Sequence, residues 1–440
     1  MVTVAMISDF FFPNVGGVEA HLYSLAFCLR KQGHKVIILT REREDFNLTG
    51  VRYYSNDLKV YYISCPSMPS GIILPCIISC MSFLIRDIMI REKVQVMHGH
   101  QSTSLLVIIA AFIATCMEIP YVLTQHSLHE FGDLASIELN NLYAFMSKYN
   151  VARTICVSNT VRENVILRHK ASEKHAIVIP NAIDFCFYSK RELPQPKNPS
   201  KVRIIFLTRM TFRKGIDLFL EVMPVICKRF KHVQFLVCGD GPKRNMIEHV
   251  VREFSLESQV EFKGFAAIED VPYIYSSGDI FLCTSISEAF CLAILEAAAC
   301  GSYVISTDVG GISEILPKEA ISLCNPTASD LIDKLVAAIE DKKYLNLFRT
   351  QEVIEESYSW DSVASEVSKV YTEVLTEQRP VDWVQMVKEV WSGMFNFGSL
   401  IFLFMLTNVL FFVVEVIFGG KSRRMAVDLD TSAASKKIKK

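Results

Sequence analysis

The N-terminal segment sets the strongest constraint on the fold of this chain of 440 residues. An apolar run over Val2–Ser8 is followed by a loop with Gly16 and Gly17, and then by a helical pattern that ends at Gly33. A buried strand, a glycine-containing loop and a helix in this order form the first unit of a doubly wound α/β fold. Asp9 interrupts the apolar run and no basic residue precedes it, so we expect a strand and not a signal peptide.

The same unit recurs along the chain and divides it into two domains. Further strands are expected near residues 36–40, 60–63, 94–100, 121–127, 151–159 and 176–184, and, after a proline-rich stretch over 188–200, near 202–208, 235–241, 261–265 and 280–285. Polar segments with several prolines are typical of linkers. We therefore predict two α/β domains, over 1–190 and 201–378, with functional residues at the carboxyl ends of the strands.

The stretch Ser285–Gly301 carries two acidic residues, Glu288 and Glu296, eight positions apart. Either serine before Glu288, Ser285 or Ser287, can cap a helix, alanine and leucine favour its body, and a glycine suits its C-terminal end. We expect this helix to begin near Phe290.

A helix start at this point leaves the amides of Cys291 and Leu292 without intrahelical partners, at the positive end of the helix dipole. An anion fits there, most naturally a phosphate. Glu296 in the second turn would be costly to bury without hydrogen-bond donors, and the two hydroxyls of a ribose supply them. Glu288 would face whatever lies beyond the phosphate. The alternative, from the spacing alone, is an amphipathic helix with one solvated glutamate.

The composition excludes several classes of protein. The formal net charge is −1, so nothing indicates a nucleic-acid partner. The 13 cysteines are scattered, odd in number and contain no Cys-x-x-Cys pair, which argues against a disulfide framework or zinc site and favours a reducing compartment. His98 and His100 suggest a metal, but a strand end followed by a crossover helix accounts for them more simply.

Several segments, in order, resemble the retaining nucleotide-sugar glycosyltransferases of family 4, which have the GT-B fold. They include Ser285–Gly301, the following Val304–Glu314, the loop with Gly16 and Gly17, and Arg209–Asp217. The resemblance covers roughly residues 1–378. It implies two doubly wound, Rossmann-like domains that face a cleft, with a last helix that crosses back to the first domain.

The resemblance also implies roles for individual side chains. Glu296 holds the ribose of the donor, while Glu288 and His126 orient the donor sugar. Arg209 and Lys214 neutralise the leaving diphosphate, so neither a metal nor another cofactor is expected.

Backbone groups complete the site that the resemblance implies. The Cys291 and Leu292 amides bind the diphosphate, Gly16 and Gly17 let the backbone approach it, and Gly264 belongs to the wall against the nucleotide base. Two departures are visible. The family usually has glycine where Cys291 stands, and the relevant branch usually has aspartate where Gln125 precedes His126.

A narrower resemblance rests on five segments, GGVEAHLYSLA, HSLHEFGDLAS, ICVSNTVREN, RMTFRKGIDL and SEAFCLAILEAAACG. Together they resemble the family of catalytic subunits that transfer N-acetylglucosamine to phosphatidylinositol on the endoplasmic reticulum, where glycosylphosphatidylinositol (GPI) anchor synthesis begins. The resemblance implies UDP-N-acetylglucosamine (UDP-GlcNAc) as donor, phosphatidylinositol as acceptor, and other membrane subunits as partners.

Other functions remain open at this point. They are transfer of a different UDP- or GDP-linked sugar, such as mannose, to a lipid; a membrane-anchored scaffold that binds a nucleotide sugar without turnover; and a GT-B epimerase. The presence of Arg209, Lys214, Glu288 and Glu296 disfavours the scaffold.

Two apolar runs in the first domain, Gly71–Ile90 and Leu105–Cys116, supply more apolar helix surface than such a domain usually exposes. The first is either a core helix or a surface helix in the headgroup layer of a membrane, with Arg86, Arg91 and Lys93 at its polar end. In the second case Arg86 and Arg91 would contact the phosphate of the lipid.

The segment Ser399–Phe418 is apolar over 20 residues, long enough to span a bilayer, and a polar tail over 421–440 follows it. The cations of the tail favour the cytosol. A chain without a signal peptide keeps its N-terminal domains in the cytosol, and we therefore expect a single span with a lumenal tail in the endoplasmic reticulum membrane. A hairpin or an interfacial helix is the alternative.

Overall fold

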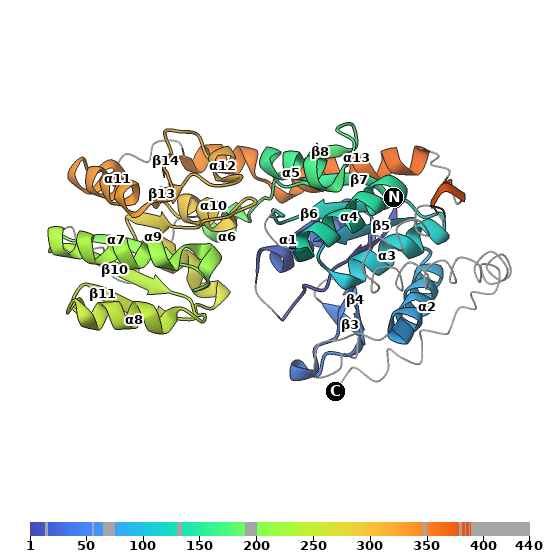
Figure 1. The fold of residues 1–440 in the computed structure, drawn as a ribbon, viewed down its shortest axis with the longest axis horizontal. Helices are drawn as coiled ribbons and strands as arrows, with labels where there is room; N and C mark the ends of the chain where they lie inside the picture. Colours follow the sequence, from blue (N-terminus) through green and yellow to red (C-terminus); the bar gives the residue numbers. More distant parts are fainter. Residues whose placement is uncertain are drawn as a thin grey trace. The chain divides into compact units, whose positions relative to one another are not determined.

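The computed structural model describes residues 1–13, 16–54, 57–64, 75–129, 134–189, 200–345 and 350–377, together with 381, 382, 384–386 and 388, and gives no side-chain placement for 44, 75–80 and 134–138. The described chain forms two compact units (Figure 1). The first contains Met1–Cys156, Arg162–Ile177 and the chain from Ala364 on, and the second contains Val157–Val161 and Val178–Val363. Most of the stretch predicted as a linker, residues 190–199, lies outside the described residues.

The first unit is built on a sheet whose described strands follow the order β3-β4-β2-β1-β5-β6-β7-β8. The edge strand β3 runs antiparallel to β4, whereas β1 pairs in parallel with both β2 and β5. The strands are β1 Thr3–Ile7, β2 Lys35–Arg41, β3 Gly50–Tyr54, β4 Leu58–Ile63, β5 Val96–His100, β6 Tyr121–Gln125, β7 Val151–Cys156 and β8 Ala176–Val178. The connecting helices are α1 Gly17–Lys31, η1 Glu44–Phe46, α2 Pro75–Glu92, α3 Leu105–Cys116, α4 Leu134–Tyr149 and α5 Asn159–His169, and α13 Trp360–Thr376 ends in this unit.

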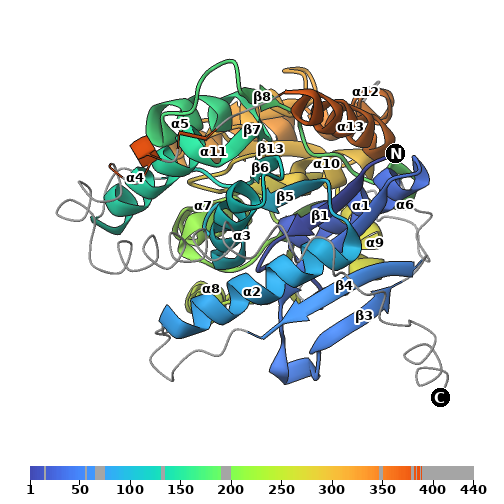
Figure 2. The same ribbon diagram turned by 90° about the vertical axis from the view of Figure 1, so that its right-hand side faces the viewer.

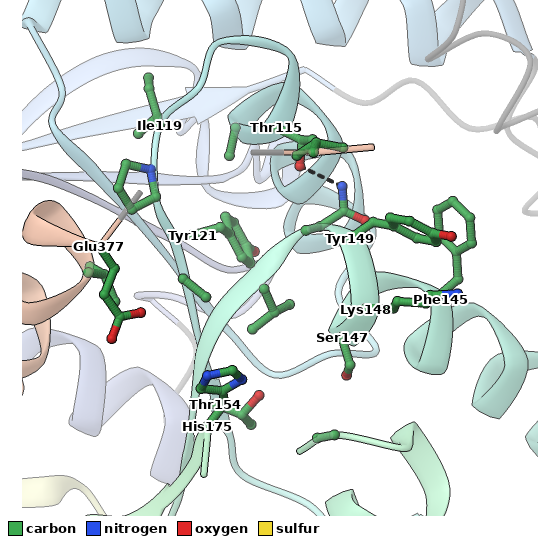
Figure 3. Close-up of a pocket in the computed structure, with 18 of the residues that line it drawn as sticks. Thr115, Ile119, Tyr121, Phe145, Ser147, Lys148, Tyr149, Thr154, His175 and Glu377 are labelled. Atoms are coloured by element: carbon green, nitrogen blue, oxygen red, sulfur yellow. Dashed lines mark hydrogen bonds between the residues drawn. The ribbon is translucent and has the colours of Figure 1, made fainter. Parts of the chain in front are cut away.

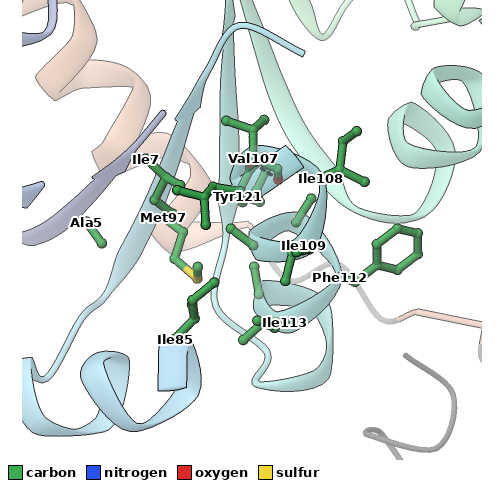
Figure 4. Packing of buried hydrophobic residues seen from close by; sticks show 14 of the residues in the cluster. Ala5, Ile7, Ile85, Met97, Val107, Ile108, Ile109, Phe112, Ile113 and Tyr121 are labelled. Carbon is green, nitrogen blue, oxygen red and sulfur yellow. Dashed lines mark hydrogen bonds between the residues drawn. The ribbon is translucent and has the colours of Figure 1, made fainter. Parts of the chain in front are cut away.

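Helix α3 forms the centre of the core on one face of this sheet. Because side chains alternate along a strand, Ala5 and Ile7 of β1 reach the same cluster as Met97 of β5 and the apolar side chains of α3 (Figure 4). The hydroxyl of Tyr121 donates to the carbonyl of Val107 at 2.9 Å, which satisfies a polar atom inside the cluster. Residues 106–115 of α3 are all buried, and only Leu105 and Cys116 at its ends are partly exposed, so α3 is a core helix. Each fully buried aliphatic side chain contributes about 1.5–3 kcal/mol.

Helix α2 packs on α3 (Figure 2) and has one buried and one exposed side. Ile85 is buried, whereas Phe83 and Leu84 are 43% and 46% exposed. The two interpretations of the sequence, core helix and surface helix, therefore each describe one side of α2. Arg86 is only 8% exposed and pairs with Asp87 at 3.2 Å. The prediction that Arg86 contacts a lipid phosphate is wrong, because its stem is packed inward and its guanidinium already has a carboxylate partner.

The second unit has a parallel sheet with the order β11-β10-β9-β12-β13-β14. Its strands are β9 Val202–Leu207, β10 Val233–Cys238, β11 Val260–Gly264, β12 Ile280–Cys283, β13 Tyr303–Thr307 and β14 Ile321–Cys324. Its helices are α6 Phe185–Tyr188, η3 Phe212–Lys214, α7 Ile216–Arg229, α8 Arg244–Glu253, η4 Ile268–Asp270, α9 Val271–Ser277, α10 Leu292–Ala299, η5 Ile312–Glu314, α11 Ala328–Glu340, η6 Lys343–Leu345 and α12 Thr350–Ser357.

An aromatic stack fixes α7 on this second sheet. The rings of Phe206 on β9 and Phe219 on α7 are parallel with centroids 3.8 Å apart, and Phe219 meets Phe235 of β10 edge-on at 5.7 Å. Offset and edge-on aromatic pairs add about 0.5–1.5 kcal/mol to the burial of their surface. The loop before α7 is thereby held at the carboxyl end of β9, where the sequence predicts functional cations.

The predicted membrane span over 399–418 lies outside the described residues. Among the helices that the structure does describe, none has both the length and the apolar character needed to cross a membrane.

Candidate active site

Helix α10, the centre of the stretch predicted to bind phosphate, begins at Leu292 and has Cys291 as its N-cap. The sequence placed the start near Phe290, two residues early, and offered Ser285 or Ser287 as the cap; the cap prediction is wrong. The backbone of Cys291 is left-handed (φ 67°, ψ 76°), and this turn separates both serines from the helix. The amides of Cys291 and Leu292 nevertheless stand at the first turn, where N–H groups have no intrahelical partner.

The conformation of Cys291 favours glycine, the residue that the resemblance leads one to expect at this position. A positive φ costs an ordinary residue roughly 1–2 kcal/mol and costs glycine nothing. The Cys291 thiol lies 4.0 Å from the sulfur of Cys283, and this neighbour, together with burial, raises the pKa of the Cys291 thiol.

Lys214 and Glu288 form an ion pair at the carboxyl edge of the second sheet. The Ser285 hydroxyl donates to the same carboxylate at 2.8 Å. Burial opposes the charge on Lys214, but the Glu288 carboxylate outweighs it, so the pKa of the ammonium is raised and Lys214 is fully charged at neutral pH. Gly215 lets the backbone next to Lys214 approach Thr284, because a Cβ at position 215 would lie 1.7 Å from the carbonyl oxygen of Thr284.

Glu296 lies in the second turn of α10, partly accessible and without a cation partner among the described residues. Burial raises the pKa of its carboxyl to about 7, although hydrogen bonds from the Tyr188 and Tyr275 hydroxyls oppose this rise. The Tyr275 hydroxyl lies 3.4 Å from Oε2, a long and weak bond. The carboxylate therefore has capacity for stronger donors, as the prediction of a ribose at this position requires.

Two other predicted residues stand apart from this cluster. Arg209 is exposed in the loop after β9. Its carbonyl accepts from the backbone N–H of Thr211 at 2.8 Å, and the described residues show no hydrogen bond or ion pair to its guanidinium. Gly264 ends β11 with a left-handed backbone (φ 74°), and Phe265 next to it is 71% exposed. An exposed aromatic ring at a strand end is available to contact a flat base, and the assignments of Arg209 and Gly264 stay predictions.

Gly16 and Gly17 begin α1 in the first unit. A Cβ at Gly16 would lie 2.5 Å from a carboxylate oxygen of Glu19. This oxygen is the end of a flexible side chain that can move, so sterics alone do not require glycine here, and a role toward the donor phosphates stays a prediction.

His126 follows β6 and belongs to a group of neutral imidazoles in the first unit. Ligand nitrogens of His21, His100 and His126 all lie within 4.8 Å of one another, an arrangement that is compatible with a metal ion. His100 Nδ1 lies 3.3 Å from His126 Nε2. Burial and the neighbouring rings hold the pKa of both His100 and His126 well below the usual value. A neutral imidazole is able to hydrogen-bond a sugar hydroxyl, and the expectation that no metal is needed stays a prediction.

Sequence reasoning missed several members of these clusters. Tyr188 and Tyr275, which contact Glu296, come from α6 and α9, and neither stands in a motif. Cys283 lies at the end of β12 and gives no separate signal. His21 was detectable, because it follows Gly17 by four positions and so returns to the same side of α1 one turn later.

A large cavity lies elsewhere in the first unit (Figure 3). Its volume is about 1450 Å³, and Tyr121 and Val151, the first residues of β6 and β7, are part of its wall. Thr115 accepts a hydrogen bond from the Asn150 amide there at 2.6 Å. This is the amino edge of the sheet, whereas His126 lies at the carboxyl edge, so the cavity is separate from the predicted site.

Comparison with known proteins identifies the family. Two family descriptions match, "Glycosyltransferase Family 4" over residues 15–185 and "Glycosyl transferases group 1" over residues 190–357. The chain is 39% identical to a phosphatidylinositol N-acetylglucosaminyltransferase subunit of Arabidopsis thaliana, over 84% of this chain and 82% of that protein. It is 38% identical to the human subunit of the same name, over 85% of this chain and 76% of that protein. The chain belongs to this family of transferase subunits.

Solved structures confirm the GT-B fold for this member of the family. Sucrose-phosphate synthase from Thermosynechococcus elongatus matches with a TM-score of 0.70 at 19% identity, over 85% of this chain and 99% of that chain. Anabaena Alr3699/HepE in complex with UDP matches with a TM-score of 0.68 at 15% identity, over 85% of this chain and 100% of that chain. The predicted mixed α/β architecture with two largely parallel sheets is confirmed.

Proposed function

We propose that this chain is the catalytic subunit that transfers N-acetylglucosamine from UDP-GlcNAc to phosphatidylinositol, the first step of GPI anchor biosynthesis. The observation that carries the proposal is the identity of 38–39% to the transferase subunits from a plant and from humans over 84–85% of the chain. A different lipid-directed sugar transfer would not account for identity of this extent to proteins that share one name.

The geometry of the second unit supports a nucleoside-diphosphate donor. Lys214, Arg209 and the first turn of α10 supply positive charge and free N–H groups for a diphosphate. Glu296, whose hydrogen bond from Tyr275 is long, is available to the ribose hydroxyls. Because two cations and a helix start neutralise a diphosphate directly, the proposed transfer needs no metal.

The pairing of Glu288 supports transfer without a covalent glycosyl-enzyme. A carboxylate that is held by Lys214 and Ser285 is a weak nucleophile, since both partners stabilise its negative charge. In the proposed route the acceptor hydroxyl attacks on the face that the diphosphate leaves, and a phosphate oxygen takes the hydroxyl proton. The configuration at the sugar is retained. Glu288 and His126 orient the sugar, and the Lys214 ammonium stabilises the negative charge that develops on the leaving UDP.

We further propose that the protein acts at the endoplasmic reticulum membrane with its two domains in the cytosol, held by a span over 399–418 and by partner membrane subunits. The relatives are named as subunits, which supports an assembly with other chains. Asn47, in the sequon Asn47-Leu-Thr49, is exposed and tests the orientation. We expect no glycan on Asn47, and mass spectrometry that finds one would overturn the cytosolic assignment.

The function is tested on membranes from cells that lack their own copy of this subunit. Full-length wild-type protein should restore incorporation of label from UDP-[³H]GlcNAc into lipid, and Arg209→Ala should reduce it. Arg229→Ala is the matched control, since Arg229 is an exposed arginine on α7 that pairs with Glu340 at 2.8 Å and has no assigned role. If wild type fails to restore incorporation while its partner subunits are present, the proposed function is wrong.

A further inference from the structure

The amide of Gln125 connects two loops at the carboxyl edge of the first sheet. Its oxygen accepts from the backbone N–H of Ser102 at 3.2 Å, and its nitrogen donates to the carbonyl of Ser127 at 3.0 Å. A backbone N–H only donates and a carbonyl only accepts, so these two partners fix which end of the amide is oxygen. Gln125 is fully buried, and its hydrogen bonds are therefore made away from competing water.

The fixed amide in turn determines the state of a second histidine, His129. The same Gln125 nitrogen, a donor, faces His129 Nε2, and the Ser102 hydroxyl lies 3.0 Å from that atom. His129 Nε2 must therefore accept, which places the imidazole proton on Nδ1 and leaves the ring neutral. An imidazolium would direct an N–H at the Gln125 amide, and two donors would face each other.

The segment that joins these residues also carries His126. Asn164 of α5 binds the backbone of His129 on both sides, accepting from its N–H at 3.1 Å and donating to its carbonyl at 3.0 Å. Residues 126–129 are thus tied to their own strand, to the β5 loop and to α5. His126, at the start of this segment, reaches His100 at 3.3 Å.

We propose that Gln125 and His129 are positioning residues that hold the segment 126–129 so that His126 contacts the donor sugar, an inference that rests on the proposed function. The pair performs this task with neutral groups. It stands in place of the carboxylate that the resemblance leads one to expect before His126. The proposed acceptor carries a negatively charged phosphate, which a carboxylate would repel. A neutral pair adds no repulsion toward that phosphate.

The test uses His129→Gln and His129→Asn, two amides of nearly equal polarity. A glutamine carbonyl reaches the position of Nε2, the accepting atom, whereas an asparagine carbonyl reaches only the position of Nδ1. His129→Asn should lower kcat for transfer roughly tenfold to a hundredfold, because a misplaced contact costs up to about that much. His129→Gln should stay within about threefold of wild type. Gln125→Ala combined with His129→Asn should be no slower than the slower single variant, because the two residues act as one unit.

Binding separates positioning from general loss of structure. The readout is the ratio of the UDP-GlcNAc and UDP affinities of full-length protein by calorimetry. A variant that only unfolds loses both affinities together, whereas a misplaced His126 lowers the affinity for UDP-GlcNAc and leaves that for UDP unchanged. Equal behaviour of His129→Gln and His129→Asn, or an unchanged ratio in His129→Asn, overturns the inference. Absence of transfer by wild type is a separate result that contradicts the proposed function instead.

Discussion

Replacing Glu296 by glutamine should stabilise the protein and weaken nucleotide binding at the same time. Glu296 has a pKa of about 7 in the folded chain against an ordinary value of 4.5. Below pH 4.5 the carboxyl is protonated in both the folded and the unfolded chain, and the folded state has its full stability. As pH rises from 4.5 through 7, the folded state loses stability, because the carboxyl ionises more readily in the unfolded chain. The difference of 7 minus 4.5, at 1.36 kcal/mol per unit, corresponds to about 3 kcal/mol. Because the carboxylate is partly accessible to water, we expect about 1–2 kcal/mol.

Glu296→Gln removes this cost, since a neutral amide has no proton to lose. The variant should therefore gain little stability near pH 5 and about 1–2 kcal/mol near pH 8, measured by chemical unfolding of the ligand-free protein. Glu340→Gln, which changes an exposed glutamate of α11, is the matched control and should show no such gain.

UDP binding should respond to pH in the opposite sense. In the proposed complex the ribose hydroxyls donate to the Glu296 carboxylate and lower its pKa, so wild-type affinity should fall as pH drops below about 7. In Glu296→Gln the affinity should be weaker by roughly tenfold to a hundredfold, as for a lost hydrogen bond to a charged group, and flat over the same range. Equal stability of the variant and wild type at pH 8, or a pH slope that persists in the variant, would refute the reasoning.

Three further results are expected. Lys214→Ala should lose about 2–4 kcal/mol of transition-state stabilisation in a steady-state assay, because its charge meets the leaving diphosphate in the second unit. Gly215→Ala should unfold at clearly lower denaturant than wild type, since its Cβ would overlap a carbonyl, whereas Gly33→Ala, with a similar positive φ but nothing within 4 Å, should lose only about 1–2 kcal/mol. Phe83→Ser with Leu84→Ser should raise the KM for phosphatidylinositol in vesicles and leave UDP binding intact, because these side chains are the exposed apolar part of α2.

Each of these results has a contradicting outcome. Near-normal turnover of a folded Lys214→Ala variant would contradict the assignment of Lys214 as a cation that stabilises the leaving diphosphate. Equal losses in the two glycine variants would mean that the steric overlap is relieved at no cost. Phe254→Ser, an equally exposed phenylalanine of the second unit, should leave the KM for the lipid unchanged, and a similar rise there would show that the effect does not depend on α2.

Strands, loops and crossover helices were predictable because their signals are local. The apolar run that ends before Asp9 and the helix that ends at Gly33 correspond to β1 and α1 with shifts of a residue or two. The start of α10 was predicted two residues early and its cap was not predicted, because serine is a common cap and the left-handed turn at Cys291 has no signal in the sequence.

The candidate site was predictable as a set of residue types and not as a set of contacts. The sequence singles out Lys214 and Glu288, but their ion pair requires two loops from different strands to meet. In the same way, the sequence notes Gln125 only as a departure from a pattern. Its partner His129 becomes meaningful once the structure shows the amide and the imidazole side by side. The Lys214–Glu288 pair is 74 residues apart in the chain and leaves no periodic signal. Gln125 and His129 are only four residues apart, but they lie at a strand end and in a loop, where no helical periodicity predicts the contact.

The central claim is tested most directly by the chemical identity of the product. The full-length chain, purified with its membrane partners and placed in vesicles of phosphatidylinositol, is supplied with UDP-[³H]GlcNAc. We predict a labelled lipid from which phosphatidylinositol-specific phospholipase C releases the label in water-soluble form, with the sugar in the α configuration of the donor. A label that appears only with another nucleotide sugar, that stays in the lipid after the phospholipase, or that carries the β configuration would contradict the account.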